Sequence, residues 1–182
     1  FDNIIIVGGM GNAMLKNTGI NIGKSVCDDG YKDLVEEILK KSETHDCKIY
    51  YPLDVVVSKT LDGNGTIKEI NKVNNDEMIL DIGPKTITSI KNIINDSNTL
   101  LWNGPAGYFE NPSFANGTKK ILEIIADKRI KDEIYAVAGG GETVAVINKF
   151  NKLDTFNFVS TAGGAFLEYL EGKELPGIKA LN

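Results

Sequence analysis

Short apolar runs alternate with longer amphipathic segments along nearly all of this 182-residue chain. The runs are strand-length and apolar at successive positions, as in strands buried on both faces of a parallel sheet. Strands are predicted at 4–7, 48–51, 78–82, 99–102, 134–138 and 156–160. The spacing of apolar residues between the runs predicts helices over 11–16, 31–41, 85–95, 113–128, 142–149 and 165–171. We expect Asp28-Asp29-Gly30 to open the second helix.

One region departs from the alternation. Asp62-Gly63-Asn64-Gly65 is a turn signal between the apolar run 54–58 and the alternating residues 66–70, and this pattern predicts a small β-hairpin over 55–70. The whole pattern predicts a single α/β domain over residues 1–182, a three-layer αβα sandwich with a mostly parallel, Rossmann-like sheet. Because a strand is predicted at residue four with no initiator Met before it, we expect the chain to begin inside a longer protein.

Composition excludes several classes of function. The 20 Lys and Arg residues against 25 Asp and Glu give a net charge of −5, which leaves no basic surplus for nucleic acid. No run of 18 apolar residues occurs, so a membrane span is not expected. Two cysteines, Cys27 and Cys47, and the single His45 are too few for a zinc cluster. We expect reduced thiols and a cytoplasmic protein.

Glycine is the most informative residue type. Four glycine-rich turns follow predicted strands: 8–9, 103–107, 139–141 and 162–164. The turns after parallel strands share one edge of the sheet, and their backbone N–H groups can hold an anion. Close helix–strand packing also selects glycine, but four such turns favour a phosphate-bearing ligand. The GxGxxG fingerprint of dinucleotide-binding folds is absent from all four.

The turn Gly139-Gly140-Gly141-Glu142-Thr143 combines bare amides, a carboxylate and a hydroxyl at a predicted helix start. Amides can take phosphate oxygens, and a carboxylate can hold Mg²⁺ together with nucleotide oxygens. The alternative is ordinary helix-start chemistry, because Thr and Glu are favoured there without any ligand. The residues alone leave both interpretations open.

Five strings together resemble the phosphoglycerate kinase family in order and spacing over essentially the whole chain. They are Asp81-Ile82-Gly83-Pro84-Lys85-Thr86, Trp102-Asn103-Gly104-Pro105-Ala106-Gly107-Tyr108-Phe109-Glu110, Gly139-Gly140-Gly141-Glu142-Thr143, Ser160-Thr161-Ala162-Gly163-Gly164-Ala165 and the closing segment 167–177. The resemblance is to the C-terminal, nucleotide-binding half only. It implies reversible phosphoryl transfer between 1,3-bisphosphoglycerate with ADP and 3-phosphoglycerate with ATP, in glycolysis, by a monomer.

The resemblance also implies roles for particular residues. Those that would line the adenine slot are Gly8, Gly9, Val26, Leu80, Pro105 and Tyr108. Glu110 would accept from the ribose hydroxyls, and Asn103 would reach the triphosphate. The phosphate chain would be held by Gly140, Gly141 and Thr143, with Glu142 at the position of the Mg²⁺ carboxylate. Gly163 and Gly164 would start the helix that faces the transferred phosphoryl group. For Val26 and Leu80 the alternative is plain core packing.

Three positions depart from the family pattern. Glu142 stands where Asp is usual and reaches one methylene further, which bears on metal geometry. Val7 and Ala162 stand where glycine is common.

The basic residues that bind the acid substrate in this family belong to its N-terminal half. Arg129, the only Arg in this chain, is expected to be solvated at the surface. The chain alone is therefore predicted to bind nucleotide without turnover. Two alternatives remain, a free-standing nucleotide sensor and a Rossmann-type oxidoreductase, and the missing GxGxxG argues against the second.

Overall fold

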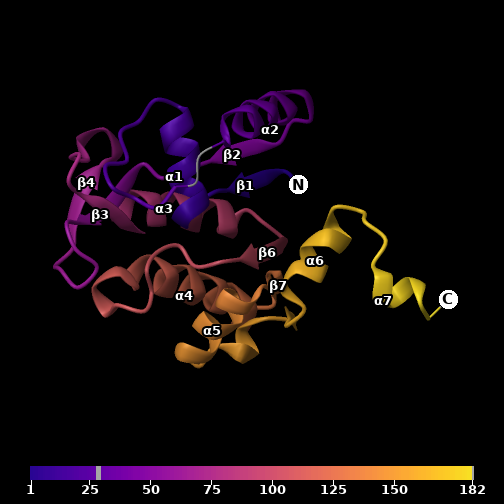
Figure 1. Cartoon of the computed structure of the whole chain (residues 1–182). Helices are drawn as coiled ribbons and strands as arrows, with labels where there is room; N and C mark the ends of the chain where they lie inside the picture. Colours follow the sequence, from indigo (N-terminus) through magenta and orange to yellow (C-terminus); the bar gives the residue numbers. More distant parts are fainter. Residues whose placement is uncertain (28–29, 182) are drawn as a thin grey trace. The chain divides into compact units, whose positions relative to one another are not determined.

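The computed structural model describes residues 1–27 and 30–181, so the predicted helix start at Asp28-Asp29 lies outside the described residues. The chain divides into two compact units. Unit 1 consists of Phe1–Asp96 and Pro105–Ile121, and unit 2 consists of Ser97–Gly104 and Leu122–Asn182. Figure 1 shows the elements coloured along the chain.

Unit 1 begins with a parallel strand pair and two helices that pack beside it. These elements are β1 (Asn3–Ile5), α1 (Gly8–Asn17), α2 (Lys32–Thr44) and β2 (Lys48–Tyr50). Strands β1 and β2 pair in parallel, and α2 lies next to β2 in Figure 1. Buried Ile6, Met14 and Val35 form the core between these elements, as expected for apolar residues that recur at strand and helix spacing.

The rest of unit 1 contains an antiparallel sheet in the order β4-β3-β5. Its elements are β3 (Asp54–Ser58), β4 (Thr66–Glu69), the short 3₁₀ helix η1 (Ile70–Lys72), β5 (Met78–Ile82) and α3 (Pro84–Asn95). Val56 pairs with Ile67 across β3 and β4, so the predicted hairpin is confirmed. Val55, Val57 and Val73 are its buried core.

Unit 2 is built on three parallel strands in the order β6-β7-β8. Its elements are β6 (Thr99–Asn103), β7 (Tyr135–Gly139), α5 (Gly141–Lys149), η3 (Leu153–Thr155), β8 (Phe158–Ser160), α6 (Gly163–Leu170) and α7 (Pro176–Lys179). Two further helices, η2 (Pro112–Phe114) and α4 (Asn116–Ile130), begin in unit 1, and α4 continues into unit 2. The rings of Trp102 and Phe156 stack with centroids 5.8 Å apart, which fixes the end of β6.

The predicted α/β class is confirmed, with parallel strands flanked by helices and one antiparallel hairpin. Hydrogen bonds group the described strands into three sheets, whereas the apolar pattern predicts one mostly parallel sheet. Among residues 1–27 and 30–181, the short helices η1, η2, η3 and α7 leave no periodic signal, and the sequence did not predict them. No helix among the described residues has both the length and the apolar character needed to cross a membrane.

Candidate functional site

The residues expected to bind base and ribose all belong to unit 1. Gly8 opens α1 with a φ of +61°, which is a backbone conformation that favours glycine. A Cβ at Gly8 would lie 2.9 Å from the carbonyl oxygen of Pro105. The glycine is therefore required both for the backbone turn and for the close approach of the loop that carries Pro105.

Two other predicted residues are joined by a backbone hydrogen bond. The Tyr108 N–H donates to the Leu80 carbonyl over 2.7 Å. Leu80 is buried, whereas about a third of Tyr108 (36%) remains exposed. Glu110, two residues further on, is exposed. The contacts thus bring Leu80 to the Pro105–Glu110 loop, and Gly8 approaches the same loop.

Gly9 and Val26, two further residues expected to line the adenine slot, share a cavity in unit 1. Both line an apolar cavity of about 360 Å³ whose walls come mainly from α1 and α2. Val26 is 78% exposed, and its carbonyl accepts a hydrogen bond from Asn12 Nδ2 at 3.1 Å. Val26 is therefore not a core residue, whereas the buried Leu80 fits the alternative of core packing.

Sequence reasoning missed the most deeply placed charged residue near this group. Asp81 is 1% exposed and accepts hydrogen bonds from the backbone N–H groups of Gly117 at 2.8 Å and Ile82 at 2.9 Å. Burial raises the pKa of Asp81 to about 6, and the backbone hydrogen bonds oppose that rise. The available signal was a charged residue inside the apolar run 78–82, because such a charge is rarely buried without partners.

The residues expected to hold phosphates all belong to unit 2. Gly140 has a φ of +96°, and a Cβ there would overlap Asn103 Oδ1. A Cβ on Gly139 would lie 2.5 Å from the ring of Phe166. Two of the three glycines in this turn therefore pack closely against other residues, and Gly140 lies beside the Asn103 side chain.

Thr143 is fully buried. Its hydroxyl oxygen accepts a hydrogen bond from the Gly104 N–H at 2.6 Å. This bond joins the turn after β6 to the first turn of α5. Thr143 therefore connects the two loops that carry Asn103 and Gly140, and its phosphate role stays a prediction.

Gly141 and Glu142 form the open start of α5. Gly140 occupies the N-cap position, no side chain caps the helix, and a Cβ on Gly141 would meet nothing within 4 Å. Glu142 is exposed in the first turn. The part of the chain that the structure describes holds no group of three His, Cys, Asp or Glu side chains suited to a metal. A single carboxylate fits Mg²⁺ that is held mainly by nucleotide phosphates and water.

Gly163 and Gly164 begin α6 in a similar way. Gly163 has a φ of +44°, and neither glycine has an atom within 4 Å of the position a Cβ would take. No side chain caps this helix at Ala162. The start of α6 therefore has open space beside both glycines, as the start of α5 has beside Gly141.

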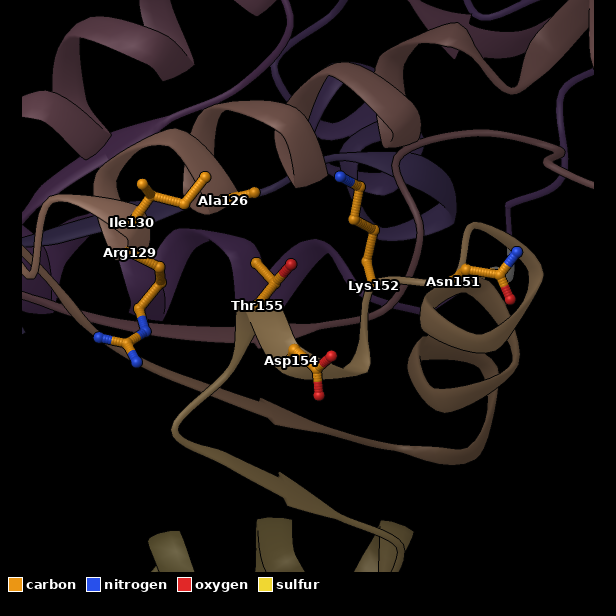
Figure 2. Close-up of a pocket in the computed structure, with 7 residues that line it drawn as sticks. All are labelled: Ala126, Arg129, Ile130, Asn151, Lys152, Asp154 and Thr155. Atoms are coloured by element: carbon orange, nitrogen blue, oxygen red, sulfur yellow. The ribbon is translucent and has the colours of Figure 1, made fainter.

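A second cavity, of about 280 Å³, lies in unit 2 and is lined by none of the predicted site residues. Figure 2 shows that the charged ends of Arg129, Lys152 and Asp154 point in different directions around it. The expectation of a solvated Arg129 is wrong: its side chain is only 21% exposed, and it donates to Asp132 and to the Ile134 carbonyl. Its Nε is buried and has no hydrogen-bond partner.

The fold and loops define an α/β protein with glycine-rich turns suited to a phosphate-bearing ligand. A protein-family model described as phosphoglycerate kinase matches residues 1–173. The chain therefore belongs to the phosphoglycerate kinase family.

Known relatives support the same assignment. The chain is 46% identical over 182 residues to a phosphoglycerate kinase of Zymomonas mobilis, covering 99% of this chain and 46% of that protein. The solved phosphoglycerate kinase from Coxiella burnetii matches with a TM-score of 0.91 at 40% identity, over 100% of this chain and 46% of that one. The enzyme from Pyrococcus horikoshii matches with a TM-score of 0.82 at 29% identity, over 99% of this chain and 45% of that one. The chain thus spans about half the length of the relatives it matches.

Proposed function

We propose that these residues form the nucleotide-binding half of a phosphoglycerate kinase that works in the cytoplasm as a monomer. The reaction is phosphoryl transfer between 1,3-bisphosphoglycerate with ADP and 3-phosphoglycerate with ATP. In this proposal the residues for base and ribose are Gly8, Gly9, Val26, Leu80, Pro105, Tyr108 and Glu110. The residues for the phosphate chain are Asn103, Gly140, Gly141 and Thr143.

The main support from the geometry is the open N-terminus of α5. No side chain caps its first turn, and the space that a Cβ of Gly141 would occupy is open. The positive end of a helix favours an anion, and bare glycine lets that anion approach closely. Gly163 and Gly164 offer a similar start at α6, which suits the transferred phosphoryl group in the proposed reaction.

Magnesium would supply positive charge against the phosphate oxygens during transfer. Glu142 is the residue of this chain that would hold it. Its exposed carboxylate lies in the first turn of α5, next to the Gly141 amide proposed to take phosphate. Direct coordination or coordination through water is compatible with one carboxylate.

Calorimetry of the 182-residue chain with ADP, with and without Mg²⁺, tests the binding proposal. We expect binding with Mg²⁺, weaker binding for Glu142→Ala, and partial recovery for Glu142→Asp. Equal binding by wild type and Glu142→Ala would make that carboxylate only a helix starter. Absence of any ADP binding would remove the nucleotide role altogether.

A coupled assay of ATP formation tests the catalytic proposal. The chain alone should turn over at background rate, because Arg129, its only Arg, is held by Asp132 and the Ile134 carbonyl and phosphoryl transfer needs cationic groups on the moving phosphate. Adding the N-terminal half of the Zymomonas mobilis relative should restore ATP formation. Binding that is never accompanied by turnover in this mixture would favour a nucleotide sensor.

A further inference from the structure

The loop Pro105–Glu110 carries three residues proposed to contact the nucleoside, and its backbone is anchored at two points. The Tyr108 N–H donates to the Leu80 carbonyl at 2.7 Å. The Ala106 N–H donates to Thr118 Oγ1 at 3.0 Å, and Thr118 is fully buried at the start of α4. The position of the loop therefore depends on how the first turn of α4 is held relative to β5.

The Asp81 carboxylate holds these two elements together. It follows Leu80 in β5 and accepts from the Gly117 N–H at 2.8 Å in the first turn of α4. Asp81 Oδ1 also occupies the space that side chains would need at Gly107 in the loop and at Gly117 in α4. A Cβ on Gly107 would be 2.5 Å from Oδ1, and a Cβ on Gly117 would overlap it. Loop, strand and helix thus converge on one buried carboxylate.

We propose that Asp81 is a positioning residue for the nucleoside end of the site. It touches no proposed ligand atom. It acts by fixing the first turn of α4, which in turn fixes Ala106 through Thr118, and so places Pro105, Tyr108 and Glu110. This role rests on the proposed nucleotide function and extends it to a residue outside the contact set.

Unit 1 contains a closely matched control. Asp54 is likewise buried, at 3% exposed, and its carboxylate accepts from the Lys85 and Thr86 N–H groups at the start of α3. A Cβ on Gly83 would overlap it, as one on Gly117 would overlap Asp81. Asp54 therefore shares the chemistry and burial of Asp81, but it anchors a helix that carries none of the proposed nucleotide contacts.

The experiment compares Asp81→Asn with Asp54→Asn in the 182-residue chain, by calorimetry with MgADP and with magnesium pyrophosphate. Asp81→Asn should weaken MgADP binding about tenfold, the size of one lost hydrogen bond, and leave pyrophosphate binding unchanged. Asp54→Asn should leave both affinities unchanged at a temperature where both variants are folded. Equal effects of the two substitutions, or none from Asp81→Asn, would overturn the positioning role.

Thr118 provides a second route to the same loop if Asp81→Asn does not fold. Thr118→Val removes the acceptor for Ala106, and Thr118→Ser keeps it, so the valine variant should lose MgADP affinity and the serine variant should retain it. Hydrogen exchange at Ala106 and Tyr108 should quicken in Asp81→Asn but not in Asp54→Asn. Unchanged exchange would show that Asp81 does not hold the loop. Failure of the wild type to bind ADP would instead remove the proposed function, and this role with it.

Discussion

Two helix starts of unit 1, those of α3 and α4, differ from the starts of α5 and α6 in unit 2. In unit 1 the N-termini of α3 and α4 are each filled by a buried aspartate from another segment, Asp54 and Asp81. In unit 2 the N-termini of α5 and α6 start at glycine and have no capping side chain. A helix N-terminus attracts negative charge in either case. At α3 and α4 the protein therefore supplies its own carboxylate, whereas α5 and α6, where a phosphate is proposed to bind, start without one. The N-cap residues of α1 and α2 in unit 1 also provide no side-chain hydrogen bond, so an open start does not by itself mark a phosphate site.

The largest expected loss of stability comes from removing the aspartate carboxylate that binds the start of α3. Asp54→Ala would leave the N–H groups of Lys85 and Thr86 without their carboxylate. It would also remove one of the two acceptors of the Thr86 hydroxyl, the carboxylate oxygen at 2.8 Å, and keep the Asp54 carbonyl. Loss of a buried, hydrogen-bonded charge costs about 3 to 4 kcal/mol. Urea denaturation should show this loss, with Asp62→Ala in the exposed hairpin turn as control. Equal stability of the two variants would mean that the Asp54 contacts contribute little.

The contribution of Asp81, the aspartate at the start of α4, to the free energy of unfolding depends on pH. Burial raises the pKa of Asp81 from 3.8 to about 6 in the folded chain, so the folded state binds this proton more tightly than the unfolded state. The contribution of Asp81 to the free energy of unfolding is therefore greatest below pH 4 and falls as the pH rises through 6, by about 3 kcal/mol in all.

Other carboxylates titrate over the same range, so the measurement is the difference in stability between wild type and Asp81→Asn from pH 4 to pH 7. Wild type should lose stability relative to the variant as the pH rises. A constant difference would show that the Asp81 pKa is not raised.

The filled helix starts also mark the limit of prediction from sequence. Apolar runs and glycine turns are local patterns, so they predicted the parallel strands, the hairpin and the loops around Gly140 and Gly163. The caps on α3 and α4 come from residues 31 and 36 positions away along the chain. No local periodicity reports such a contact, because it exists only once the strands have paired.

The burial of Thr143 has the same origin, whereas Arg129 is held by Asp132 and Ile134, which lie close to it in the chain. The sequence indicates that Thr143 is a hydroxyl residue at a helix start, but its hydrogen-bond partner, the Gly104 N–H, lies 39 residues away in the chain. Arg129 lies among charged neighbours in a helix end, which is typical of a solvated position, yet its Nε is covered. Site chemistry that depends on the turn itself was predictable, and chemistry that depends on a distant strand end was not.

A pair of glycines sharpens the contrast between filled and open helix starts. Gly117→Ala would place a methyl group against Asp81 Oδ1 and the Ile82 side chain, and overpacking of this kind costs about 2 kcal/mol. Gly141→Ala meets no atom within 4 Å and should change stability by less than about 1 kcal/mol. Thermal denaturation measures both.

Nucleotide binding tests the open start of α5 directly. Gly141→Ala should weaken MgADP binding in calorimetry, because its methyl group would occupy space proposed for a phosphate oxygen. A Gly141→Ala variant that is as stable as wild type and binds MgADP equally well would show that the open start of α5 does not receive the phosphate chain.

The smallest expected change concerns the buried hydroxyl of Thr143, which joins the turn after β6 to the first turn of α5. Thr143→Val keeps the buried volume but leaves the Gly104 N–H without its acceptor, at a cost of about 1 kcal/mol. Thr143→Ser keeps the oxygen and should recover most of that stability in urea denaturation. If valine lowers MgADP affinity more than serine while both remain folded, the bond between the two loops supports binding as well as folding. A valine variant as stable as wild type would show that this short bond contributes nothing to the fold.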